Sequence, residues 1–116
     1  MFSLGYSQRY YLYHQACDMR KGFDGLSGIV VNELGKSPTD GNVYIFINKN
    51  RNQMKLLHWE HGGLVLYQKR LERGRFSIPN LANNTGAINW PDLVLIVEGI
   101  EVSNIKRKPR FELKNQ

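Results

Sequence analysis

Apolar residues recur along this chain with two different periods, and each period predicts a different kind of element. Between residues 19 and 34 the apolar residues Phe23, Leu26, Val30 and Leu34 recur at intervals of three or four. Spacing by three or four residues places these side chains on one face of a helix. Asp18 is the predicted N-cap of this helix, and Gly35 is the predicted C′ residue that ends it.

Three apolar or β-branched runs follow the predicted helix, and short polar segments separate them. The runs are 42–48 (NVYIFIN), 54–60 (MKLLHWE) and 64–70 (LVLYQKR). They predict an antiparallel meander with turns near Arg51 and Gly62. The first run is uniformly apolar, which is typical of a strand covered on both faces. The side chains expected to be buried are Val43, Ile45, Leu57 and Val65.

Strand pairing and one further strand complete the predicted sheet. Residues 9–14, RYYLYH, are aromatic-rich and predict a short strand. A turn centred on Gly62 would place Lys69 opposite Lys55 and Arg70 opposite Met54. Like charges opposite one another destabilise a sheet unless an anion or solvent compensates them.

The segment 89–100, NWPDLVLIVEGI, carries conflicting signals. Its LVLIV run has the composition of a strand, whereas its flanking residues have the pattern of a helix. Asn89 is a plausible N-cap with Asp92 three residues later, and Gly99 follows the apolar run. We therefore expect a helix over Pro91–Glu98 that ends at Gly99.

Together these elements predict a small single α+β domain, with an antiparallel three- to four-stranded sheet and two helices. The domain is expected over residues 1–105, followed by a basic tail over residues 106–116. No apolar run approaches the length of about 18 residues that spans a membrane, and the N-terminus lacks the features of a secretion signal. A single cysteine, Cys17, allows no intrachain disulfide. We expect a cytoplasmic protein.

The net charge of +6 at pH 7 is unevenly distributed. Residues 49–75 carry seven basic and two acidic side chains, and residues 106–116 carry five and one. Segregated positive charge is typical of a protein that meets a polyanion. The alternative is a solvated basic surface without a partner.

The stretch DMRKGFDGL places two cations, Arg20 and Lys21, in the first turn of the predicted helix, where cations are unfavourable. One reading is that a phosphate approaches the helix N-terminus closely there. The other is that Gly22, Gly25 and Gly28 form a low stripe against which a second backbone packs.

The stretch KRLERGRF, residues 69–76, alternates cations with apolar residues. It predicts a bend that buries Leu71 and Phe76 while its arginines project, with Gly74 at positive φ. Arginine forks match phosphate geometry well. The alternative is an internal ion-pair network around Glu72, Glu60 or Glu98. The candidate contacts to nucleic acid are Arg20, Lys21, Lys49, Arg51, Lys55, Lys69, Arg70, Arg73, Arg75, Lys106, Arg107 and Lys108.

An enzymatic function is not expected. His58 and His61 flank Glu60, but residues three apart on a strand point to opposite faces, which disfavours a shared metal. The carboxylates show no spacing that would gather them around metal ions. The glycine-rich GFDGLSG lacks the lysine of a phosphate-binding loop. We expect no metal and no cofactor.

The quoted segments resemble the TnpB accessory proteins of insertion-sequence-66-type transposable elements of bacteria. The resemblance covers about residues 9–105 and rests on DMRKGFDGLSGIV, on residues 41–76 and on PDLVLIVEGI. The hairpin segment NKNRNQ is poorer in arginine than the family pattern, and Gln68 follows Tyr67 in place of a second aromatic residue. Such proteins are encoded beside a separate transposase, so the resemblance implies a role in transposition and DNA recombination but no catalytic residues.

We therefore expect a non-enzymatic accessory factor that contacts DNA through its clustered arginines and lysines. The alternative is a module that docks on the transposase of the same element through aromatic side chains such as Trp59, Tyr67 or Trp90. Phosphate contacts would make binding strongly salt-dependent, whereas an apolar protein interface would not.

Overall fold

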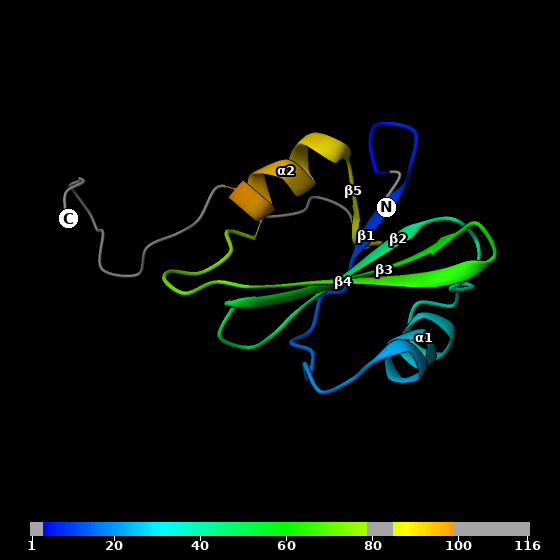
Figure 1. Ribbon diagram of the computed structural model, residues 1–116, viewed down its shortest axis with the longest axis horizontal. Helices are drawn as coiled ribbons and strands as arrows, with labels where there is room; N and C mark the ends of the chain where they lie inside the picture. The colour runs from blue at the N-terminus through cyan, green and yellow to red at the C-terminus, as the bar shows by residue number, and fades with distance from the viewer. Residues whose placement is uncertain (1–3, 79–84, 99–116) are drawn as a thin grey trace.

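The computed structural model describes residues 4–78 and 85–98 of the chain. The elements in chain order are β1 (Tyr10–Leu12), α1 (Phe23–Asn32), β2 (Val43–Ile47), β3 (Gln53–Glu60), β4 (Gly63–Arg70), β5 (Ala87–Ile88) and α2 (Trp90–Glu98). The strands form one five-stranded sheet in the order β4-β3-β2-β1-β5. The two helices lie on opposite faces of this sheet (Figure 1). The small α+β domain predicted from the sequence is confirmed.

The predicted meander is formed by β2, β3 and β4, which pair antiparallel in chain order. All five residues of β2 are buried, as expected for a strand covered on both faces. Val43, Ile45 and Leu57 are fully buried, whereas Val65 is half-buried.

The register of the second hairpin differs by one residue from the predicted one. Its loop has two residues, His61 and Gly62, with φ values of 52° and 81°. Two consecutive residues at positive φ are typical of the tight hairpin turn that matches strand twist. Lys69 consequently lies opposite Met54, and Gln68 opposite Lys55. Since a shift of one residue exchanges the faces of a strand, Lys55 and Lys69 lie on opposite faces.

The sheet is larger than predicted because β1 and β5 extend it beyond β2. β1 is parallel to β2, and β5 is antiparallel to β1. Parallel neighbours need a long crossover connection, which α1 supplies. The sheet is therefore mixed, and the chain forms three layers with the sheet between the helices.

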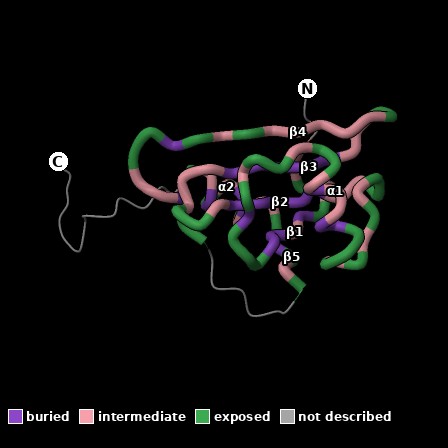
Figure 2. Tube along the Cα trace, turned by 90° about the horizontal axis from the view of Figure 1, so that it is seen from below, coloured by how far each residue is buried: buried purple, intermediate pink, exposed green. Residues whose placement is uncertain are grey.

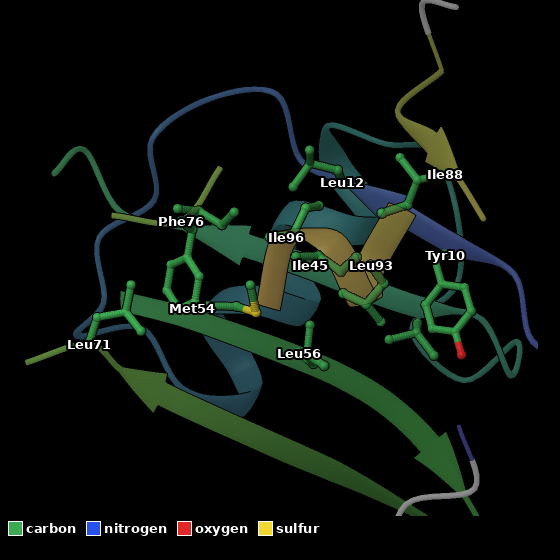
Figure 3. Packing of buried hydrophobic residues seen from close by; sticks show 12 residues of the cluster. Tyr10, Leu12, Ile45, Met54, Leu56, Leu71, Phe76, Ile88, Leu93 and Ile96 are labelled. Atoms are coloured by element: carbon green, nitrogen blue, oxygen red, sulfur yellow. The ribbon is translucent and has the colours of Figure 1, made fainter. Parts of the chain in front are cut away.

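Each face of the sheet carries its own hydrophobic cluster, and the most buried parts of the chain lie in and beside the central strands (Figure 2). On the face covered by α2, here called the α2 face, Leu93 and Ile96 pack with Ile45, Met54 and Leu56 (Figure 3). The other, α1 face holds a second cluster. Its buried members are Tyr13, Cys17, Leu26, Ile29, Val30, Tyr44, Phe46 and Leu57.

Helix α1 begins later than predicted. Its N-cap is Gly22, and no side chain among the described residues caps it by a hydrogen bond. Asp18 accepts a hydrogen bond from the backbone N–H of Arg20 at 2.9 Å, because a short carboxylate readily closes a local turn in place of a helix cap. Beyond the helix, Gly35 has a φ of 64°, the left-handed conformation typical of a glycine that ends a helix. It lies two residues past the C-cap Glu33, one position beyond the C′ position predicted for it.

Helix α2 confirms the helical interpretation of the late segment. Asn89 Oδ1 accepts from the N–H of Asp92 at 2.9 Å, and the N–H of Asn89 donates to Asp92 Oδ2 at 3.2 Å. This reciprocal pair is a capping box. The predicted helix end at Gly99 lies outside the described residues. Within the part of the chain that the structure describes, both helices are too short to cross a bilayer.

Candidate nucleic-acid interface

The turn between β2 and β3 is organised by one asparagine. Asn48 Oδ1 accepts hydrogen bonds from the N–H groups of Asn52 and Gln53, both at 2.9 Å. The chain reverses its direction at Arg51, which has a φ of 58°. The exposed tip therefore consists of Lys49 and the neighbouring Asn50.

The bend KRLERGRF packs directly on this turn. Leu71 N–H donates to the carbonyl of Asn52 at 2.8 Å, and Phe76 N–H donates to the carbonyl of Arg51 at 2.6 Å. Leu71 and Phe76 are buried in the α2-face cluster. Gly74 has a φ of 74°. The predicted bend, its buried apolar pair and its left-handed glycine are all confirmed.

These contacts gather five of the nine predicted cations that lie in the described residues at one end of the sheet. We call this surface the basic end, and it comprises Lys49, Arg51, Arg70, Arg73 and Arg75. Lys49, Arg70 and Arg73 are exposed, whereas Arg51 and Arg75 are half-buried. Lys69 lies at the same strand end, opposite Met54 on the α2 face. The turn and the bend lie on the same side of the molecule (Figure 1).

The loop before α1 runs beside the basic end, because Cys17 N–H donates to the carbonyl of Ile47 at 2.9 Å. Arg20 is exposed and makes a bidentate ion pair with Asp18, with its Nη2 2.7 Å from Asp18 Oδ2. This guanidinium lowers the pKa of the Asp18 carboxyl. An open recess of about 470 Å³ separates the loop from the turn, lined among others by Arg20, Lys49 and Asn50.

The stretch DMRKGFDGLSG can be interpreted either as a phosphate site at the helix N-terminus or as a glycine stripe against which a second backbone packs. The surroundings of its three glycines fully support neither interpretation. A Cβ on Gly22 would meet open space, and one on Gly28 would reach only the end of the Asn32 side chain at 4.0 Å. A Cβ on Gly25 would lie 3.1 Å from the Lys21 side chain. In the described part of the chain, the stripe thus receives the stem of Lys21 and not a second backbone. Both cations precede the helix, and the charge of Arg20 is paired.

Lys55 is predicted to contact nucleic acid, but its position in the structure argues against that role. The residue is 6% exposed, and its Nζ donates to the carbonyls of Met19 and Lys21 at 2.8 and 2.6 Å. The ammonium therefore fastens the loop before α1 to β3 and is not presented to a phosphate. The candidates Lys106, Arg107 and Lys108 lie outside the described residues.

The histidines and the cysteine occupy separate environments. His58 is buried, with its Nε2 3.7 Å from Glu60 Oε2, whereas His61 is exposed in the tight turn. Burial raises the pKa of the Cys17 thiol. Within residues 4–78 and 85–98, no three His, Cys, Asp or Glu side chains come together as metal ligands would.

Two structural roles at this surface were not predicted from the sequence. The Asn48 side chain closes the β2–β3 turn, and Lys55 holds the loop before α1 against β3. An asparagine just before a polar loop, with Asn52 four residues later, could have suggested a side-chain-closed turn. The partners of Lys55 are distant in sequence, so its sequence neighbours carry no comparable signal.

The aromatic side chains proposed for protein docking are half-buried, and Tyr67 and Trp90 line one apolar groove of about 200 Å³.

The fold and this surface define a small α+β protein with a helix on each face of its sheet and a basic end. More particularly, the chain belongs to the family described as IS66 Orf2 like protein, whose model matches residues 8–107. This family is associated with transposition of insertion sequences. The resemblance carried by DMRKGFDGL and KRLERGRF is thereby confirmed.

Two relatives are uncharacterized proteins of Sinorhizobium fredii (strain NBRC 101917 / NGR234). Protein y4jC is 30% identical over 95 residues, which cover 82% of this chain and 81% of the relative. Protein y4hO is 32% identical over 101 residues, which cover 87% and 88%. No solved structure matches the chain.

Proposed function

We propose that this protein is a non-enzymatic accessory factor in transposition that binds duplex DNA through the basic end. One observation carries the proposal: the two backbone hydrogen bonds from Leu71 and Phe76 seat the arginine bend on the turn at residues 51–52. They concentrate cations from two segments that are about 20 residues apart in sequence. The transposase of the same element is the proposed second partner.

The chemistry of the basic end suits phosphates better than base edges. Arg70 and Arg73 are exposed beside Lys49, and guanidinium groups bind phosphate oxygens in bidentate fashion. Phosphate contacts position a protein on DNA without reading sequence. We therefore expect binding that is steeply salt-dependent and weakly sequence-selective.

A pair of double variants with equal charge change tests the proposal. In the first, Arg70→Gln and Arg73→Gln remove two exposed cations from the basic end. In the control, Arg9→Gln and Lys36→Gln remove two cations that do not belong to the basic end. The backbone carbonyl of Arg9 accepts from Val43 N–H at the start of β2, and Lys36 Nζ lies 4.6 Å from the centre of the Tyr11 ring. DNA affinity is measured by fluorescence anisotropy at several salt concentrations with two duplexes of unrelated sequence.

Each lost phosphate contact lowers the slope of log affinity against log salt by about 0.9, so the first variant should lose about 1.8. The control should keep the parent slope, and both duplexes should behave alike. Equal losses in both variants would show that diffuse charge, and not the basic end, binds DNA. Loss of transposase association with unchanged DNA affinity would instead support the docking alternative.

A further inference from the structure

Strand β4 forms one edge of the sheet, and its first five residues lack the features that usually protect an edge. It pairs with β3 without interruption over all eight of its residues, so no bulge turns it away. Its first five residues, GLVLY, include neither proline nor charge. Natural edge strands are commonly shortened, kinked or charged to prevent pairing with another chain. Among the residues that the structure describes, nothing pairs with the outer side of β4.

The outward-facing backbone groups of β4 can be assigned from the ladder. Leu71 N–H points toward β3, where it donates to Asn52. Backbone groups of successive residues in an antiparallel strand point to alternate sides. The N–H and C=O groups of Leu64, Leu66 and Gln68 therefore point to the open edge. Three consecutive donor–acceptor pairs are available to a partner strand.

The side chains at this edge are also incompletely covered. Leu64, Val65, Leu66 and Tyr67 are all half-buried. Tyr67 additionally lines the apolar groove beside α2, together with Trp90 and Leu93. A strand added to β4 would gain backbone hydrogen bonds and bring its α2-face side chains to the mouth of that groove, as in other cases of strand addition.

We propose that the occupant of this edge is a second copy of the chain, paired antiparallel through β4 about a two-fold axis near Leu66. Charge decides the direction, because Lys69 and Arg70 lie at one end of β4. In-register parallel pairing would place these cations beside their own copies, which is destabilising. Antiparallel pairing separates them by the length of the strand and sets them against the uncharged half of the partner.

The proposed register pairs the outward-facing backbone N–H and C=O groups of β4 with those of the other copy. With the axis at Leu66, that residue pairs with Leu66 of the other copy, and Leu64 pairs with Gln68 of the other copy. These are the residues whose backbone groups point outward. Val65 then faces Tyr67 of the other copy, a β-branched and aromatic pair that favours sheet formation. Two copies would share one continuous sheet across a closed, isologous contact.

Gln68→Pro tests the proposal with little disturbance of the monomer. Gln68 is exposed, and its N–H does not serve the β3 ladder, so proline is compatible with this edge position. Gln68→Thr is the matched control because it keeps the backbone donor. A second variant, Val65→Lys, places a charge in the middle of the edge at a residue that belongs to neither hydrophobic cluster. Sedimentation velocity is recorded over about a hundredfold range of micromolar concentrations.

The parent chain and Gln68→Thr should form dimers as concentration rises. Gln68→Pro removes two amide donors from each dimer by symmetry, and its dissociation constant should rise at least about thirtyfold. Val65→Lys should also be monomeric, and circular dichroism of the diluted proteins checks that each variant folds. A parent chain that stays monomeric throughout, including one that instead captures a strand of the transposase, would overturn the proposal. Dimers that persist in both Gln68→Pro and Val65→Lys would overturn it as well.

Discussion

Replacing Lys55 by methionine tests whether this lysine stabilises the fold or contacts DNA. The ammonium is buried and donates to the carbonyls of Met19 and Lys21. Methionine has a similar length and no charge, so it removes both hydrogen bonds while filling most of the space.

The expected cost can be worked out from these contacts. Hydrogen bonds to a charged group contribute about 1.5–3 kcal/mol each. Part of this is offset, because the variant no longer buries a charge and because the two carbonyls belong to half-buried and exposed residues that water can reach. We expect a net loss of about 2 kcal/mol in the free energy of unfolding, and a fall in Tm of about 10 °C.

Denaturant unfolding of Lys55→Met measures this loss, with Lys69→Met as the control. Lys69 is half-buried on the edge strand, and its replacement should change stability by less than about 0.5 kcal/mol. The salt slope of DNA binding should be the same for Lys55→Met and the parent. A variant as stable as the parent, with a salt slope reduced by about 0.9, would show that Lys55 contacts a phosphate and would refute this reasoning.

Three further predictions concern the scaffold. In Gly86→Ala the new Cβ would lie 2.5 Å from the carbonyl oxygen of Leu12 at a φ of 80°, so thermal unfolding should show a loss of at least about 2 kcal/mol. Asn89→Ala removes the cap of α2 and should cost about 1 kcal/mol, whereas Asn89→Ser should cost much less, both measured by urea unfolding. Burial and a nearby carboxylate raise the pKa of Tyr13 from 10.0 to about 12. The folded state thus holds this proton longer than the unfolded state, stability should fall as pH rises from 10 to 12, and Tyr13→Phe should make that fall shallower.

Features that depend on short-range chemistry could be predicted from the sequence. The capping pattern of Asn89 and Asp92 identified α2 against its strand-like composition. The apolar runs identified the meander, and the spacing of Leu71 and Phe76 identified a bend from which Arg70 and Arg73 project, although Arg75 is half-buried. In each case the residues that determine the structure lie within a few positions of one another.

Features that depend on a choice between local options or on distant partners could not be predicted. Asp18 can cap a helix or close a turn on Arg20, and the sequence does not decide between them. The glycines after His61 allow turns of two or three residues, and the shorter one shifts the register. The clamp formed by Lys55 joins residues more than 30 positions apart. The parallel pairing of β1 with β2 was missed although strand, helix and strand follow one another there, an order typical of a crossover.

Because the bend packs on the β2–β3 turn, the basic end can form only after the bend has been synthesised. The hydrogen bond from Phe76 to Arg51 closes the basic end, and a growing chain cannot form it until residue 76 has left the ribosome. An emerging chain that ends within β4 carries Lys49 and Arg51 but not the neighbours that concentrate their charge. Any affinity that relies on the basic end can therefore appear only after the bend has emerged and packed on the turn. A fragment that ends within β4 should bind a polyanion more weakly than the folded chain, because it lacks Arg73 and Arg75.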